Sequence, residues 1–277
     1  MTAILLALGA SLAWSIADFG AGVGARRLST FVVAAFLQAA GLVVALLVLL
    51  ATGEHAPTWR EAGWAVFASL LGLVGLTAFY RGLAVGTMGI VGPISTCASL
   101  VPLAYGLARG ERPATHQAVG VALAVAGVVG ASLEPQETGR GRKVGAGVGF
   151  ALVAVAGFGC SLIGLSKAAA GGAVWATLIM RLVALPVLIA VASAVRAEWP
   201  GRSLWPLLVG AGIFDTGATL LYAAASTRGL LSVVAVLSSL YPVGILVLAR
   251  VVLQERVARP QLAGVAVALT GVALVSA

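Results

Sequence analysis

Charged residues are scarce in this sequence. Only 9% of its 277 residues are Asp, Glu, Lys or Arg, whereas soluble globular domains carry roughly 25%. Hydrophobic residues make up 61% of the chain, and the mean hydropathy is +1.09. Because so few charges cannot cover a water-facing surface, the composition excludes an ordinary soluble domain and predicts an integral membrane protein.

Cysteine is nearly absent, and the residue patterns of common enzymes are missing. Cys97 and Cys160 lie in apolar stretches without C-x-x-C spacing, so we interpret them as small packing residues with no disulfide framework. The two histidines are isolated, and no H-E-x-x-H or G-x-S-x-G occurs. The runs at 20–25 and 145–150 lack the last glycine of G-x-G-x-x-G and follow no strand. We therefore expect no enzyme, no metal site and no cofactor.

The chain is basic, with a formal net charge of +8. In a soluble protein this charge would suggest a nucleic-acid partner. Here Lys and Arg are spread singly through the segments between apolar runs, which is typical of membrane topology, so no nucleic-acid partner is expected. The first apolar run lacks a basic leader and is longer than a signal-peptide core, so no cleavable signal is expected.

Long apolar runs, by contrast, are abundant. A bilayer-spanning helix needs about 20 apolar residues, and division of the chain at its polar clusters gives ten such runs. They are 3–24, 30–51, 62–83, 88–107, 115–133, 144–167, 173–195, 204–225, 230–252 and 260–277. Short breaks require neighbouring helices to be antiparallel. The expected fold class is an all-α membrane protein with ten transmembrane helices.

Two parts of the sequence are similar to each other. Residues 111–128 (ERPATHQAVGVALAVAGV) match 255–272 (ERVARPQLAGVAVALTGV) at an offset of 144, with Glu, Arg, Gln and two glycines in register. Upstream, the offset is 140 for Ser-Leu-Val-Pro ending at Pro102 and Ser-Leu-Tyr-Pro ending at Pro242. Low complexity would not place polar residues in register, so the sequence predicts a duplication.

The duplication divides the chain into two predicted repeats, 1–133 and 144–277, with a polar linker at 134–143. Each repeat has five predicted spans. Because five is an odd number, the second copy must start on the opposite side of the membrane and run inverted.

A Pro-containing fourth span, a Glu-Arg turn and a fifth span reading Q-x-x-G-x-x-x-A-x-x-G-V resemble the EamA family of the drug/metabolite transporter superfamily. The runs WSIADF (14–19) and FDTGATLLYAAASTRG (214–229) resemble members with Asp in the first and eighth helices. The resemblance covers both halves and implies ten helices around a central cavity that transport small metabolites. It does not imply which metabolite. The first copy departs from the second by being four residues shorter between its Pro and its Glu.

Three ionisable residues fall inside predicted spans: Asp18, Arg181 and Asp215. Such residues are costly in a bilayer and usually face a cavity or a partner. Asp215 is near the middle of the eighth span and Arg181 is about a third of the way into the seventh. They either line a transport path or form a structural ion pair. Asp18 is nearer the end of its span, where it could instead reach interfacial water.

Gln38 occupies the place in the second span that Arg181 holds in the seventh, at an offset of 143. This difference predicts an asymmetric cavity, with helix–helix hydrogen bonding as the alternative role of Gln38. Pro102 and Pro242 fall inside spans and are candidate hinges, because proline removes a backbone donor and kinks a helix.

Hydroxyl groups and aromatic rings supply further candidates. Ser238 and Ser239, like Ser95 and Thr96, could contact substrate or bond a carbonyl of their own helix. Tyrosines could present hydroxyls and rings to a cavity, or could anchor at the membrane interface. The tyrosines in question are Tyr80, Tyr105, Tyr222 and Tyr241. Anchoring suits the tryptophans Trp59, Trp64, Trp199 and Trp205 better.

The Glu-Arg pairs and the glycines have structural interpretations. We expect each pair to cap or clamp its own hairpin; the pairs are Glu111 with Arg112 and Glu255 with Arg256. In the last helix of each repeat, two glycines seven residues apart share one face. That face packs either within the monomer or in a homodimer.

Together these features predict a secondary transporter of small metabolites, exporting by proton coupling or solute exchange, in the plasma or inner membrane. Its expected partners are a small-molecule substrate, protons as a candidate coupling ion, and the lipid bilayer. The alternative is a non-transporting membrane scaffold or assembly protein, which would leave the intramembrane Asp and Arg unexplained.

The orientation of the termini has two predictions. Loops after odd-numbered spans carry most of the Lys and Arg residues (Arg26, Arg27, Arg81, Arg140, Arg142, Lys143, Arg196, Arg202, Arg250, Arg256, Arg259). Loops after even-numbered spans carry fewer (Arg60, Arg109, Arg112, Lys167, Arg228). The positive-inside rule therefore places both termini outside the cytoplasm, whereas the family resemblance implies that both are inside.

Overall fold

The computed structural model describes the whole chain except residues 86–90, 92–93, 133–143, 253, 255–258 and 277. The described residues form helices and contain no strand. The long helices are α1 (Thr2–Ala25), α2 (Thr30–Thr52), α3 (Trp59–Val85), α7 (Val144–Ala168), α8 (Ala173–Ala194) and α9 (Trp205–Ser226). The shorter ones are α5 (Leu100–Ala108), α6 (Thr115–Ser132), α10 (Leu231–Ser238), α11 (Tyr241–Val252) and α12 (Arg259–Ser276). Short 3₁₀ turns lie at Cys97–Ser99, Ala169–Gly171 and Arg202–Leu204.

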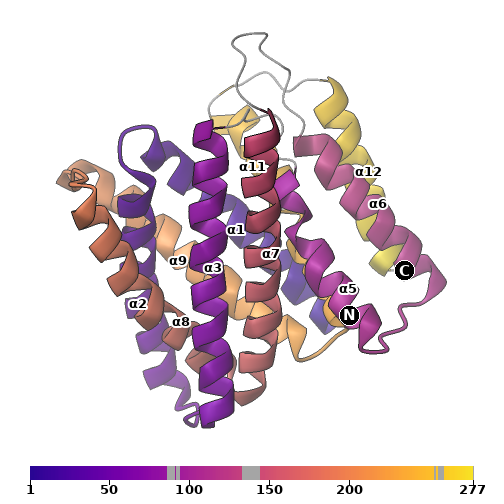
Figure 1. Ribbon diagram of the computed structural model, residues 1–277. Coiled ribbons are helices and arrows are strands. Elements are labelled where there is room, and N and C mark those ends of the chain that lie inside the picture. The colour runs from indigo at the N-terminus through magenta and orange to yellow at the C-terminus, as the bar shows by residue number, and fades with distance from the viewer. Residues whose placement is uncertain (86–90, 92–93, 133–143, 253, 255–258, 277) are drawn as a thin grey trace.

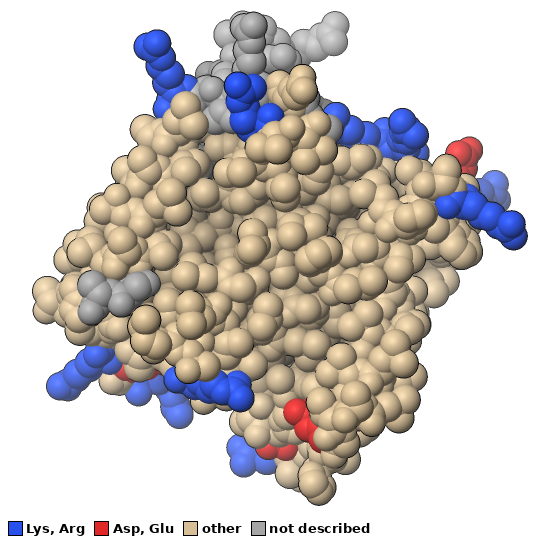
Figure 2. All heavy atoms as spheres, turned by 180° about the vertical axis from the view of Figure 1, so that it is seen from behind, with Lys and Arg blue, Asp and Glu red and all other residues tan. Residues whose placement is uncertain are grey.

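The distribution of length and charge is that of a multi-pass membrane protein. Seven helical stretches are long and apolar enough to cross a bilayer, and three shorter apolar helices lie at Ile94–Ala108, Thr115–Gly130 and Arg259–Val275. Figure 2 shows the charged side chains at the two ends of the molecule, with a broad uncharged band between them. Helices suit this setting because they satisfy their backbone hydrogen bonds internally.

The helices pack in pairs that join the two halves of the chain. Helix α1 lies against α9, α3 against α7, α2 against α8, and α6 against α12. Figure 1 shows α6 and α12 side by side at one edge, with the N- and C-termini at the same end of the molecule. Each of these four pairs contains one helix from each half, so the two halves share one core.

Small residues let the paired helices approach closely. A methyl group at Gly120 of α6 would lie 2.7 Å from the carbonyl oxygen of Gly271 in α12, and Gly130 faces the Cα of Gly264 at 3.2 Å. Ala268 of α12 is fully buried and packs against Gly127 of α6. The glycine faces predicted for these helices therefore pack against each other within one chain, which is the intramolecular one of the two alternatives.

Two of the predicted spans are not continuous α-helices. The 3₁₀ turn Cys97–Ser99 precedes α5, and a break at Ser239 and Leu240 separates α10 from α11. Pro102 and Pro242 lie three and two positions into the helices that follow, where a missing backbone N–H costs least. The prediction of one unbroken helix over 230–252 is therefore wrong. Helix α5 has 9 residues and α11 has 12, in keeping with the shorter first copy.

Helix ends differ from the predicted spans by a few residues, as at Trp59, where α3 starts three residues earlier than expected. Four tryptophans that we expected at the interface are exposed (Trp59, Trp64, Trp199 and Trp205). The predicted linker at 134–143 and the Glu255–Arg256 pair lie outside the described residues.

Candidate functional site

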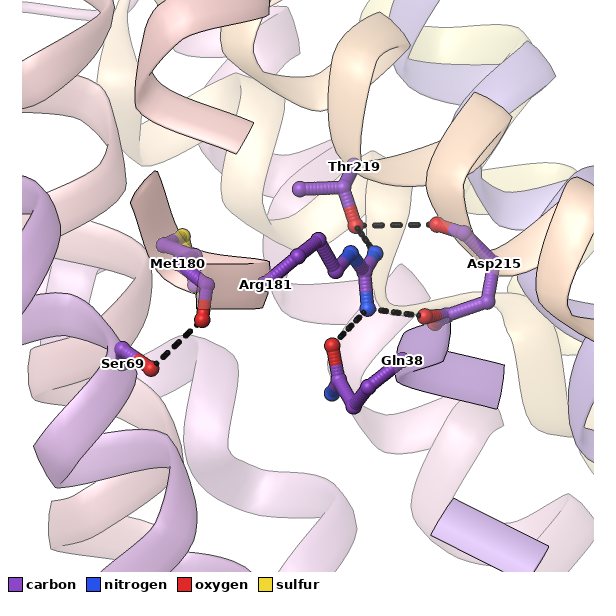
Figure 3. Close-up of polar contacts among 6 residues, drawn as sticks. All are labelled: Gln38, Ser69, Met180, Arg181, Asp215 and Thr219. Atoms are coloured by element: carbon purple, nitrogen blue, oxygen red, sulfur yellow. Dashed lines mark hydrogen bonds and ion pairs between the residues drawn. The ribbon is translucent and has the colours of Figure 1, made fainter. Parts of the chain in front are cut away.

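Arg181 of α8 is the centre of a buried polar network (Figure 3). Its Nη1 donates to Oδ2 of Asp215 in α9 at 2.6 Å and to Oε1 of Gln38 in α2 at 2.7 Å. Its Nη2 donates to Oγ1 of Thr219 at 3.0 Å, and that hydroxyl donates in turn to the carbonyl oxygen of Asp215. The guanidinium thus ties α8 to α2 and α9, and the ion pair between the two predicted spans is formed.

Arg181 is held tightly by its surroundings. Its side chain is 6% exposed, against 20% for Asp215. No hydrogen-bond partner among the described residues is found for its Nε or for the hydroxyl of Thr216. Both groups pack where a side chain at Gly41 of α2 would stand. Glycine at position 41 therefore makes the space that the guanidinium occupies.

The contact between Gln38 and Arg181 joins two positions that the sequence treats as equivalent, 143 residues apart. If one rotation relates the two halves, equivalent residues can touch only close to its axis. The neutral amide and the guanidinium therefore meet where the halves meet, and Gln38 acts as a hydrogen-bond acceptor between helices.

Asp18 of α1 lies close to this network. Its carboxylate is within electrostatic range of Asp215 and of the phenol groups of Tyr80 and Tyr241. The side chain is partly accessible, and no hydrogen bond from it to another described residue is found. Asp18 therefore lies near Asp215, and its access to interfacial water stays a prediction.

Aromatic rings surround the Asp18 side of the network. Trp14, one turn before Asp18 on the same face of α1, packs against Tyr222 with ring centroids 5.8 Å apart and against Tyr241 at 6.5 Å. Tyr222 is fully buried, and its hydroxyl lies 3.5 Å from the carbonyl oxygen of Leu162. Tyr80 packs edge-on against Phe31 at 6.3 Å. Of the candidate tyrosines, Tyr105 is apart from this group, with the Lys167 ammonium 5.5 Å from its ring centroid.

The candidate serines do not gather around Arg181. Ser239 donates to the carbonyl oxygen of Val236 in its own helix, at 2.8 Å. Ser238 points across to the carbonyl oxygen of Ala7 in α1, at 3.4 Å. For the buried hydroxyl of Ser95 no partner is found within the described part of the chain. Thr96 also has an interaction partner. The Ser238 hydroxyl therefore joins α10 to α1, whereas that of Ser239 bonds only a carbonyl of α10.

Glu111 caps a helix of the other half of the chain. Its carboxylate accepts hydrogen bonds from the backbone N–H groups of Leu231 and Ser232 at the start of α10, both at 2.9 Å. The prediction that Glu111 caps its own hairpin is therefore wrong. Glu54 does the same for α8, accepting from Val174 and Trp175 at 3.0 Å. A carboxylate is favourable there because the first N–H groups of a helix have no internal partner.

Two hollows open near the ends of the helices. One of ≈630 Å³ is lined by Glu54, Ser166, Lys167, Ala169, Ala170, Gly172, Ala173, Ala224, Ser226, Thr227 and Arg228. A smaller one of ≈210 Å³ lies beside Met1, Gln117 and Arg228. Neither is lined by Asp18, Arg181 or Asp215. Among the described residues no group of His, Cys, Asp and Glu could hold a metal ion.

The profile of the EamA-like transporter family matches residues 1–133 and 145–277. The chain belongs to that family. Membership identifies it as a membrane transporter of the drug/metabolite type. No curated protein matched the sequence.

A solved structure titled "Crystal structure of protein" has the same fold as this EamA-like chain. The similarity covers 99% of this chain and 98% of that one, with a TM-score of 0.83 and 19% sequence identity. Likeness at this identity establishes the fold and says nothing about substrate.

Sequence reasoning overlooked several residues of the site. Thr219 is four residues after Asp215, and Trp14 is four before Asp18, so helical spacing alone could have indicated both. Gly41 follows Gln38 by three residues on the same face of α2. Glu54 had no such signal, because its partners are 120 and 121 residues away.

Proposed function

We propose that this EamA-like protein is a secondary transporter that exports small metabolites, driven by proton coupling or solute exchange. The observation that carries the proposal is the position of Asp18: an intramembrane carboxylate next to an ion pair that already uses the nearby guanidinium. An ionised carboxylate in a bilayer requires a proton, a cation or water beside it. Asp18 is therefore the group of this cluster that can exchange such a partner during a transport cycle.

We propose further that the ten predicted helices form two inverted five-helix repeats around a central cavity. The repeated contacts support this arrangement. The Ser69 hydroxyl donates to the carbonyl oxygen of Met180 at 2.9 Å, and a methyl group at Gly212 would lie 2.8 Å from the carbonyl oxygen of Leu37. Gly212 follows Ser69 by 143 residues, and Met180 follows Leu37 by the same number. Helix breaks before Pro102 and Pro242 are suitable hinges for alternating access.

The proposal can be tested with purified protein in liposomes that contain a pH-sensitive dye. A pH gradient is imposed and a panel of radiolabelled metabolites is added, and both proton movement and uptake of the metabolite are recorded for each. We expect at least one solute to move protons with the wild type and not with Asp18→Asn, while Asp18→Glu retains activity. Solute movement that is equally fast in Asp18→Asn would contradict a role for Asp18 in coupling. No movement of any solute by folded wild-type protein would favour the scaffold alternative.

A further inference from the structure

The two halves of the chain pack alike around the site but differ in charge. Trp14 against Tyr222, at 5.8 Å, has a counterpart in Phe158 against Phe79, at 6.5 Å. Likewise, Gly20 faces the Cβ of Ala211 at 3.2 Å, as Gly164 faces that of Ala68 at 3.0 Å. These pairs relate α1 to α7 by 144 residues and α9 to α3 by 143.

The same offsets give each of the two carboxylates an apolar counterpart. Asp18 corresponds to Leu162, and Asp215 corresponds to Gly72. The α3–α7 pair therefore packs with no carboxylate at either place. The helix pairing therefore does not require these charges. The ion pair with Arg181 accounts for Asp215, whereas Asp18 has no such structural partner among the described residues.

The net charge of Asp18, Asp215 and Arg181 determines whether a cation or an anion can bind beside them. Asp18 and Asp215 supply two carboxylates, and Arg181 supplies one guanidinium, whose Nη atoms already bond Asp215, Gln38 and Thr219. Its Nε faces Gly41 of α2 instead of a cavity. An anionic ligand would thus meet two carboxylates, and both Nη1 hydrogens of Arg181 are already donated to Asp215 and Gln38. A monovalent cation would balance the excess negative charge.

The neighbouring rings add chemical selectivity. Trp14 and Tyr241 pack edge to face beside Asp18, and both are partly accessible. Aromatic faces attract ammonium groups, most strongly where water is displaced. Tyr80, which is also in electrostatic range of Asp18, adds a third ring. A carboxylate surrounded by tryptophan and tyrosine is a suitable receptor for an organic ammonium ion and offers nothing comparable to a neutral or acidic solute.

We infer that Asp18, with the rings of Trp14 and Tyr241, forms a binding site for small organic ammonium compounds on one side of the molecule only. This inference rests on the proposed transport function and names the substrate class for it. The apolar counterparts Leu162 and Phe158 form no second site, so one ammonium ion binds per chain.

The test is calorimetric binding to the full-length protein in lipid nanodiscs, with no gradient applied. The probes are two matched pairs: choline with its carbon isostere 3,3-dimethylbutan-1-ol, and benzylammonium with benzyl alcohol. We expect at least one ammonium compound to bind about tenfold or more tightly than its neutral partner, with a stoichiometry of one. Neutral partners that bind as tightly as both ammonium compounds would overturn the inference.

Variants locate the site. Asp18→Asn should abolish the preference for the ammonium compound, and Asp18→Glu should keep it, which separates lost charge from lost folding. Trp14→Leu should weaken binding about tenfold, whereas the matched change Phe158→Leu in the other half should leave it unchanged. An unchanged preference in Asp18→Asn would contradict the assignment. Binding without transport would refute the transport proposal alone, and transport confined to neutral or acidic solutes would refute this site alone.

Discussion

Arg181 is held by residues from two neighbouring helices, and this explains why a guanidinium can lie inside the helix bundle. Asp215 neutralises its charge, and Gln38 and Thr219 accept two further hydrogen bonds from its Nη atoms. Such an arrangement is costly to break from one side, since the remaining charge stays buried without its counterion.

The change Asp215→Asn should therefore lower stability. Loss of one partner of a buried ion pair costs about 3 kcal/mol, and the amide keeps the shape of the carboxylate while removing its charge. Adding Arg181→Gln should restore most of the lost stability. Thermal unfolding in detergent measures both effects, and transport measures whether Asp215 also lines the path. Normal melting and normal transport in Asp215→Asn would contradict both roles.

The sequence identifies most of the candidate residues but does not predict where they lie relative to one another. Intramembrane Asp and Arg residues are conspicuous in any apolar chain, and the equivalence of Gln38 with Arg181 indicates a shared position. The closeness of Asp18 to Asp215 could not be predicted, because it depends on how α1 is placed along α9. Helical spacing could have indicated Thr219, but which face of α9 meets Arg181 depends on packing.

At the scale of helices, close approach and capping join the two halves. Helix α6 meets α12 through glycines, so an added methyl group must displace backbone atoms. We expect Gly120→Ala, which would meet the carbonyl oxygen of Gly271, to lower the melting temperature markedly. Gly217→Ala in α9, where nothing lies within 4 Å, is the matched control and should raise stability slightly or leave it unchanged. Equal effects in both variants would contradict the close packing of α6 and α12.

The Glu111 cap gives a second prediction at this scale. Glu111→Gln removes the charge that accepts from Leu231 and Ser232, and should destabilise the start of α10 by about 1–2 kcal/mol. Glu198→Gln changes an exposed carboxylate and should have little effect. Hydrogen exchange at the first residues of α10 reports the local loss. Unchanged exchange there would show that the cap does not hold the helix.

Composition predicts where helices lie, because an apolar run of span length has few other stable forms in lipid. It does not predict where a helix breaks. Pro242 indicates a disturbance nearby, yet the break at Ser239 and Leu240 depends on which backbone groups find other partners. Long-range caps such as Glu54 on α8 are likewise set by tertiary packing.

For the whole molecule, both termini lie at one end (Figure 1). The proposed inversion predicts that the Glu111 turn and the Glu255 turn face opposite sides of the membrane. Cysteines introduced in these two turns, in a background without Cys97 and Cys160, should react with an impermeant thiol reagent from opposite faces of intact cells. Labelling of both from one face would mean that the number of membrane crossings is wrong.

The side on which the termini lie is a separate prediction. Positively charged residues favour termini outside the cytoplasm, and the family resemblance favours termini inside. A fluorescent reporter fused at Ala277 distinguishes these: fluorescence indicates a cytoplasmic C-terminus and contradicts the charge rule, whereas a silent reporter with an active periplasmic one supports it.

The central claim is that solutes cross this protein past the cluster of Asp18, Arg181 and Asp215. The most direct measurement is solute counterflow in liposomes, in which vesicles loaded with unlabelled solute take up the labelled form without an imposed pH gradient or membrane potential. Wild-type protein should accumulate label from at least one metabolite, and Asp18→Asn should lose this uptake while retaining the wild-type melting temperature. Accumulation by folded Asp18→Asn at the wild-type rate would contradict the claim.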